Sequence, residues 1–185
     1  MSTRQSDFDK ARLLAESGKA DEALEAIATC SFEEKKDACN VCIDILEGVK
    51  LVKENVWMNL YTEAVYDTFS KMNRCARDEE REQVWNRLKE MYYEITLAAK
   101  KIWRDKNMPE RLTIYVLLAK LCKSYLDVAD EESFKMCEAM AREAKFCGKG
   151  TLDDEDWKEA NRSIELIKKT IADALHERDL LVDSD

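Results

Sequence analysis

The sequence contains one pair of cysteines at the spacing used by metal and redox sites, Cys39 and Cys42. A structural zinc site needs four ligands, and it normally draws on two such pairs or on a mixture of Cys and His. No second pair is present, and the chain has a single histidine, His176. Both cysteines sit on a face of a predicted helix, and in a reducing compartment Cys packs as a small hydrophobic residue. We therefore expect no metal and no cofactor.

The other residues that could do catalytic chemistry are scattered along the sequence. His176 lies near the acidic end, and a general base needs a nucleophile or a substrate beside it. The GKG segment at Gly148 to Gly150 lacks the preceding strand and the spacing of a phosphate-binding loop. Carboxylates fall at predicted solvent-facing positions, and no E-x-x-H pair points to a di-iron bundle. We expect a protein that is not an enzyme.

The densest group of basic residues lies in KKIWRDKNMPER, at a predicted corner between two helices, and two further lysines follow in the next helix. On a chain of net charge −9, this group is suited to receive an acidic or phosphorylated segment of a protein partner. The alternative is a solvated face in which Lys and Arg complement the dipole at a helix C-terminus. The candidate partner-binding residues are Lys100, Lys101, Arg104, Lys106, Arg111, Lys120 and Lys123.

The composition favours a helical protein without a membrane or nucleic-acid partner. The 185 residues include only four Gly and one Pro, which are the residues that turns require. The acidic charge argues against binding to nucleic acid or to anionic membranes. No apolar run is long enough to span a bilayer. Without an apolar signal segment at the N-terminus, we expect a cytoplasmic protein, with the nucleus as the alternative, and buried free thiols for most of its seven cysteines.

The apolar periodicity predicts an all-α protein of about eight antiparallel helices stacked as hairpins. It predicts a single domain over residues 1–185, with an acidic C-terminus that frays from about His176. Gly18 is predicted to end the first helix, and Asn107, Asp130 and Thr151 are predicted N-caps. The predicted helices cover about 7–17, 20–30, 32–53, 56–77, 79–105, 109–128, 131–147 and the segment after Thr151.

The segment LAESGKADEALEAIATC, from Leu14 to Cys30, resembles the helix-turn-helix unit of tetratricopeptide repeats. In that unit, small residues let two helices approach closely and large apolar residues fill the flanking gaps. A period of about 34 residues does not recur cleanly along the rest of the chain. The resemblance implies a stack of hairpins with a groove for a peptide or a helix of a partner. The matching positions are Ala11, Leu14, Gly18, Ala23, Ile27 and Cys30.

The two ends of the chain are also similar to the first and last helices of 14-3-3 proteins. The KSYL segment, ending in Tyr125 and Leu126, resembles the pocket helix of that family, although Ser124 stands where the family has Arg. Lys50 and Lys53 are the nearest counterparts of the family's basic pair. This resemblance implies binding of phosphopeptides.

Three functional hypotheses follow from these patterns. The first is an adaptor or scaffold that holds a peptide or a helix of a partner protein in a helical groove. The alternatives are a diverged 14-3-3-like phosphopeptide-binding protein and a structural subunit of a larger assembly. The tryptophans follow the apolar stripes and are predicted to pack in the core, with the alternative of a groove anchor. They are Trp57, Trp85, Trp103 and Trp157.

Overall fold

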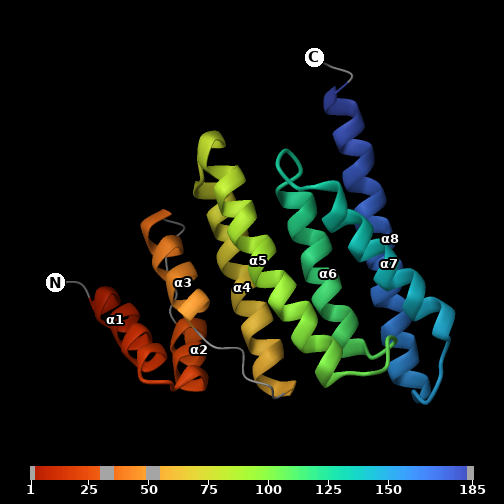
Figure 1. The fold of residues 1–185 in the computed structure, drawn as a ribbon, viewed down its shortest axis with the longest axis horizontal. Helices are drawn as coiled ribbons and strands as arrows, with labels where there is room; N and C mark the ends of the chain where they lie inside the picture. The colour runs from red at the N-terminus through yellow and green to blue at the C-terminus, as the bar shows by residue number, and fades with distance from the viewer. Residues whose placement is uncertain (1–2, 30–35, 49–54, 183–185) are drawn as a thin grey trace. The chain divides into compact units, whose positions relative to one another are not determined.

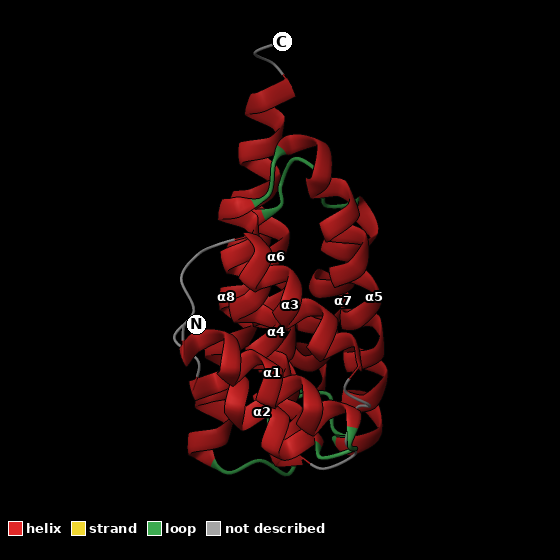
Figure 2. Cartoon of the chain, turned by 90° about the vertical axis from the view of Figure 1, so that its left-hand side faces the viewer, coloured by secondary structure: helices red, strands yellow, loops and turns green. Residues whose placement is uncertain are grey.

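The computed structural model describes residues 3–29, 36–48 and 55–182, and these residues form eight α-helices and no strand (Figures 1 and 2). The all-α class predicted from the apolar periodicity is therefore confirmed. The helices are α1 (Thr3–Glu16), α2 (Ala20–Thr29), α3 (Lys36–Gly48), α4 (Asn55–Cys75), α5 (Asp78–Ile102), α6 (Pro109–Ser124), α7 (Glu131–Cys147) and α8 (Asp154–Val182).

Contacts divide the chain into two compact units, residues 1–98 and 99–185. The division falls inside the range of α5. Each unit buries apolar side chains of its own. The single domain over residues 1–185 stays a prediction.

The first unit begins with a hairpin of α1 and α2 that turns at Gly18 (Figure 1). Gly18 has φ +79°, a left-handed conformation that favours glycine, and its N–H donates to the carbonyl of Ala15. Helix α1 packs against α2 and α3, while α4 packs against α2 and α3. Ala11 and Ala23 are fully buried, which fits the close approach of helices at small residues. Cys30, predicted to fill a small position, lies outside the described residues.

Polar side chains join α3 to the two helices that follow it. The buried Tyr61 hydroxyl of α4 donates to the carbonyl of Leu46 in α3 at 3.1 Å. Arg87 of α5 forms hydrogen bonds with both carboxylate oxygens of Glu47 and with one of Asp44, at 2.8 to 2.9 Å. Bidentate Arg–carboxylate contacts fix orientation as well as distance. These contacts therefore set the register of α3 against α4 and α5.

In the second unit, α6, α7 and α8 pack against one another. Helix α6 is buried around most of its circumference, and so its inward side chains come from several faces. They include Leu112, Ile114, Tyr115, Leu118, Ala119, Leu121 and Cys122. Helix α8 contributes a single apolar stripe, Ala160, Ile164, Ile167, Ile171 and Ala174, as the sequence predicts.

The helix ends confirm one predicted N-cap and correct two others. Asp130 accepts a hydrogen bond from the Ser133 N–H at 2.9 Å and caps α7. Met108, not Asn107, is the N-cap residue of α6. The side-chain amide of Asn107 instead donates to two carbonyls of the 148–150 loop. Asp153, not Thr151, caps the start of α8. Its carboxylate accepts hydrogen bonds from the N–H groups of Glu155 and Asp156.

The lengths of several helices also differ from the prediction. Helix α6 ends at Ser124, four residues short of the expected end, because residues 125–128 form turns in place of a further helical turn. The last helix is continuous through His176 to Val182, beyond the expected start of fraying. Parts of the third predicted helix, 32–35 and 49–53, lie outside the described residues. Among the helices in the described ranges, none combines the length and apolar content needed to cross a lipid bilayer.

Two tryptophans pack in the core as predicted. Trp85 and Trp103 are buried, whereas Trp157 in the first turn of α8 is half-buried. The backbone of Trp57 belongs to α4, but its side chain is not among those that the structure describes.

Replacing Gly18 with Ala should lower the free energy of unfolding by about 1 kcal/mol, because an L-residue with a side chain is strained at positive φ. The matched control is Gly48→Ala. Gly48 lies in helical conformation at the end of α3, and an added Cβ would meet nothing within 4 Å at either position. The control should therefore be neutral or stabilising by up to about 1 kcal/mol. Urea unfolding followed by circular dichroism measures both, and equal effects would contradict the turn assignment.

Candidate partner-binding surface

Arg111, one of the predicted surface cations, is buried, with 5 % of its surface exposed. It extends from the first turn of α6 to the end of α5, where its Nη1 donates to the carbonyls of Trp103 at 3.1 Å and Arg104 at 3.4 Å. The last carbonyls of a helix lack intrahelical donors, and a cationic side chain also complements the dipole there. The prediction that Arg111 lies on the binding surface is therefore wrong, because its guanidinium closes the end of α5.

Two further predicted residues form ion pairs within the second unit. Lys106 Nζ lies 3.0 Å from Glu143 Oε2, and Lys123 Nζ lies 2.8 Å from Glu177 Oε1. The hydrogen bond with Glu177 raises the pKa of the Lys123 ammonium group. Both pairs are solvent-exposed, and such pairs contribute little to stability. A partner would have to compete with these carboxylates for either lysine.

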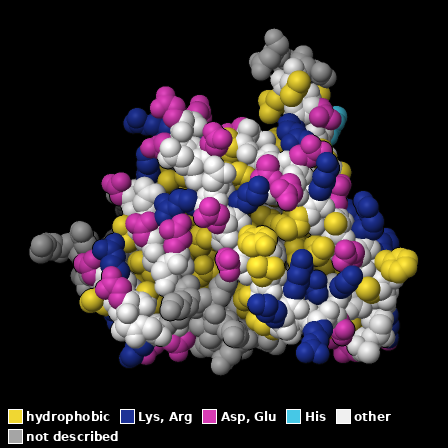
Figure 3. All heavy atoms as spheres, viewed as in Figure 1, with side chains coloured by type: hydrophobic (Ala, Val, Ile, Leu, Met, Phe, Trp, Pro, Cys, Tyr) yellow, Lys and Arg dark blue, Asp and Glu magenta, His cyan; other side chains and the backbone are white. Residues whose placement is uncertain are grey.

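The remaining four predicted residues are exposed: Lys100, Lys101, Arg104 and Lys120. Lys100 and Lys101 lie in the last turn of α5, and Arg104 follows two residues after its end. We call these three residues the α5 basic cluster. Lys and Arg side chains gather in Figure 3 over the lower end of α5 and α6. No ion pair with another described residue is present for any of the four.

Lys120 stands apart from the α5 basic cluster. It lies on the exposed side of α6, nine residues after Arg111, which corresponds to about 13 Å along the helix axis. Of the seven predicted residues, three are thus exposed neighbours at the end of α5, one is exposed further along α6, and the other three are engaged within the fold. The α5 basic cluster offers one planar guanidinium and two ammonium groups within five consecutive residues.

Tyr125, in the segment that resembles the 14-3-3 pocket helix, lies inside the fold. Tyr125 is fully buried and forms the C-cap of α6, and the Ser124 hydroxyl donates to the carbonyl of Lys120 at 3.0 Å. A buried tyrosine cannot contact a bound phosphate from this position. Lys50 and Lys53, the counterparts of the basic pair, lie outside the described residues.

The thiol and imidazole groups are distributed over both units. Cys39 and Cys42 are both fully buried on α3, and His176 is exposed on α8. Within the part of the chain that the structure describes, no group of three or more Cys, His, Asp or Glu side chains is arranged to hold a metal ion.

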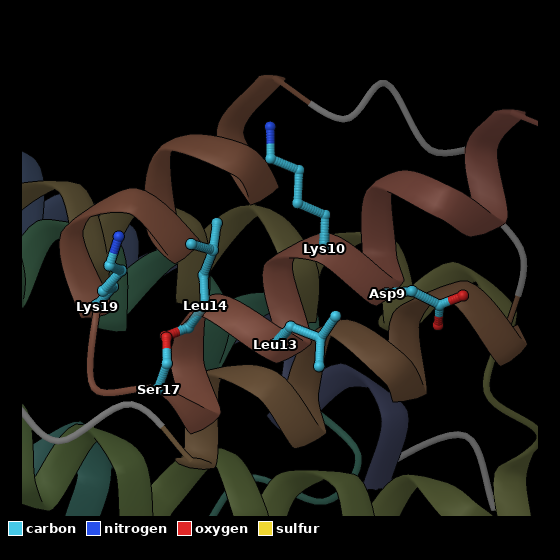
Figure 4. Close-up of a pocket in the computed structure, with 6 residues that line it drawn as sticks. All are labelled: Asp9, Lys10, Leu13, Leu14, Ser17 and Lys19. Atoms are coloured by element: carbon cyan, nitrogen blue, oxygen red, sulfur yellow. The ribbon is translucent and has the colours of Figure 1, made fainter.

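Two surface features were not predicted from the sequence. A pocket of about 680 Å³ is lined by residues of α1 and the turn after it, with Leu13 and Leu14 accompanied by Lys10 and Lys19 (Figure 4). In the second unit, Phe146 near the end of α7 is 93 % exposed. The sequence did contain a sign that Phe146 would be exposed, because Phe146 does not lie on the apolar stripe of its helix. That stripe is formed by Phe134, Cys137, Ala141 and Ala144.

Substituting Met for Arg111 should lower the free energy of unfolding by about 2 kcal/mol or more, because two carbonyl oxygens at the end of α5 lose their donor. The control, Lys106→Met, removes an exposed ion pair and should cost less than about 1 kcal/mol. Guanidinium unfolding of both variants measures the difference. A cost for Arg111→Met no larger than that of the control would contradict the structural role.

The helices that carry this surface lie within a region that matches a known protein family. A family model described as a domain of unknown function (DUF7758) matches residues 22–126, which is more than half of the chain. The match begins in α2 and ends just after α6, and so it includes the α5 basic cluster, Arg111 and Lys120. No curated protein matches the sequence. The extent of the match shows that this chain belongs to the DUF7758 family.

Proposed function

We propose that this protein is an interaction module, an adaptor or scaffold, that binds an acidic segment of a partner protein through the α5 basic cluster. The observation that carries the proposal is the exposure of Lys100, Lys101 and Arg104 without a carboxylate partner among the described residues of a chain with net charge −9. Acidic residues outnumber basic ones by 39 to 30, so carboxylates are abundant. Carboxylates are therefore available, yet none among the described residues pairs with these three side chains.

Several other lysines of the second unit, unlike the α5 basic cluster, have a carboxylate nearby. Carboxylates lie within 3.0 Å of several exposed ammonium groups, for example in the pairs Lys145–Glu165 and Lys135–Glu131. The exposed Lys158, near the start of α8, stands among acidic neighbours in the sequence DDEDWKE. The α5 basic cluster instead has Asp105 as the one acidic residue between positions 99 and 109. It is a local positive site on an acidic protein.

The chemistry of the cluster favours carboxylate or phosphate groups in an extended or helical peptide. Arg104 offers a planar fork of donors, while Lys100 and Lys101 act as compact point charges. Because all three are exposed, much of their contribution would be long-range attraction, which increases association rates and is screened by salt. Binding should therefore weaken as ionic strength rises.

Changing Lys100, Lys101 and Arg104 to Glu together should weaken binding of an acidic peptide at least about tenfold, because three attractive contacts of roughly 0.5–1 kcal/mol each become repulsive. The probe is a synthetic library in which each acidic peptide is matched by a phosphoserine version and by a neutral version. Fluorescence anisotropy at low and high salt gives the affinities. Equal binding of the neutral peptides would contradict the proposal.

The matched control is Lys158→Glu, Arg162→Glu and Lys169→Glu on α8, which changes the net charge by the same amount at exposed positions of the same unit. This variant should bind the acidic peptides nearly as well as the unmodified protein. If it weakens binding as much as the cluster variant, overall charge and not the α5 basic cluster determines affinity. A strict requirement for phosphoserine would favour the phosphopeptide-binding alternative.

A further inference from the structure

A pair of thiols lies where three helix ends meet in the first unit. Cys39 lies in the first turns of α3, and Cys75 is the last residue of α4. Cys39 and Cys75 lie close enough for their thiol groups to interact. An ion pair between Lys36 and Glu80 joins the start of α3 to the start of α5 at the same corner. The start of α3 and the end of α4 therefore bring Cys39 and Cys75 together at this corner.

The two thiols differ in exposure. Cys39 is fully buried, while Cys75 is partly exposed. Burial, with a further contribution from Cys75, raises the pKa of the Cys39 thiol to about 11. Cys39 is therefore a poor first nucleophile at neutral pH, whereas Cys75 is the thiol that a small solute can reach.

A second thiol pair in the chain provides an internal comparison. Cys122 of α6 and Cys137 of α7 also interact, but both are fully buried. The interaction with Cys137, together with burial, raises the pKa of the Cys122 thiol. The two pairs thus share the thiol–thiol contact and differ in access from solvent.

We propose that Cys39 and Cys75 form a reversible disulfide when the protein meets hydrogen peroxide, which makes this pair an oxidative modification site. Cys42 is only three residues away from Cys39 in the sequence, but the thiol that interacts with Cys39 from the next helix is that of Cys75. Disulfides of this kind in a reducing compartment are transient and serve redox sensing.

The reaction consumes one peroxide molecule and both thiols. The Cys75 sulfur attacks one oxygen of hydrogen peroxide, the O–O bond breaks, and Cys75 becomes a sulfenic acid while the second oxygen leaves as water. The Cys39 sulfur then attacks the Cys75 sulfur, the S–O bond breaks, and hydroxide leaves with the Cys39 proton as a second water. Two thiols lose two electrons and two protons, and peroxide is reduced to two water molecules.

The disulfide would tie the first turns of α3 to the end of α4. Tyr61 already joins these helices through the carbonyl of Leu46, near the other end of α3. The oxidised hairpin would then be held at both ends. We expect a higher melting temperature for the oxidised protein than for the reduced one, because the cross-link restricts the unfolded chain.

The test treats the folded full-length protein with equimolar hydrogen peroxide, blocks remaining thiols with iodoacetamide and maps disulfides in tryptic peptides by tandem mass spectrometry. The expected product joins peptide 37–50 to peptide 75–77, with the bond at Cys39. Cys75→Ser should abolish it, and Cys42→Ser should leave it unchanged. Dithiothreitol should reverse it. Circular dichroism of each variant confirms that the fold is retained.

The Cys122–Cys137 pair serves as the control, because it should remain reduced under the same treatment. Three results would overturn the proposal. The first is a bond between Cys39 and Cys42, and the second is equal oxidation of both thiol pairs in the folded protein. The third is that Cys75 stays a sulfenic acid while Cys39 remains a free thiol, which iodoacetamide alkylates once the protein is unfolded. Cys147 is exposed and can be oxidised as well, and so the peptide map is repeated in a Cys147→Ser background.

Discussion

Burial of α6 is the constraint on which the second unit depends. An isolated helix of this length is marginally stable in water, and its stability comes from the packing of its apolar side chains. Helix α6 exposes only a narrow stripe, so that α7 and α8 must both cover it. The same helix carries the polar group that completes α5, because Arg111 leaves the first turn of α6 to reach the α5 carbonyls. Packing and hydrogen bonding at this corner therefore act together.

The distribution of charged side chains follows from the local structure around them. Lys106 and Lys123 face carboxylates of α7 and α8 within the same unit, and Arg111 faces the end of a helix. The α5 basic cluster lies at the end of α5, where the helix dipole itself favours cations. This stabilising role and a role in binding are compatible, since an exposed lysine that complements a dipole still presents its ammonium group to a partner.

The helices were predictable because their apolar residues recur at helical spacing over long segments. Gly18 and Asp130 were predictable because a left-handed turn and an N-cap each favour a few residue types. Asn107 looked like an N-cap by the same rule, but its side chain binds a loop about forty residues later in the chain. No local pattern encodes such a contact.

The candidate surface shows the same limit. The basic composition of residues 100–123 was visible in the sequence, but the destination of each side chain was not. Whether Arg111 or Lys101 faces water depends on where the end of α5 meets α6, which is a tertiary property. The interaction between Cys39 and Cys75 has the same origin, because the two residues lie on different helices and no local pattern relates them.

The contact between Asn107 and the 148–150 loop has a consequence for the evolution of this chain. Asn107 donates to the carbonyls of Gly148 and Lys149, and a Cβ added at Gly150 would lie 3.2 Å from the Asn107 amide nitrogen. A larger residue at position 150 would therefore displace the amide that holds the loop. A smaller residue at position 107 would make room for it but would leave two carbonyls without their donor. The two positions are expected to covary among homologues, although more than forty residues separate them in the sequence.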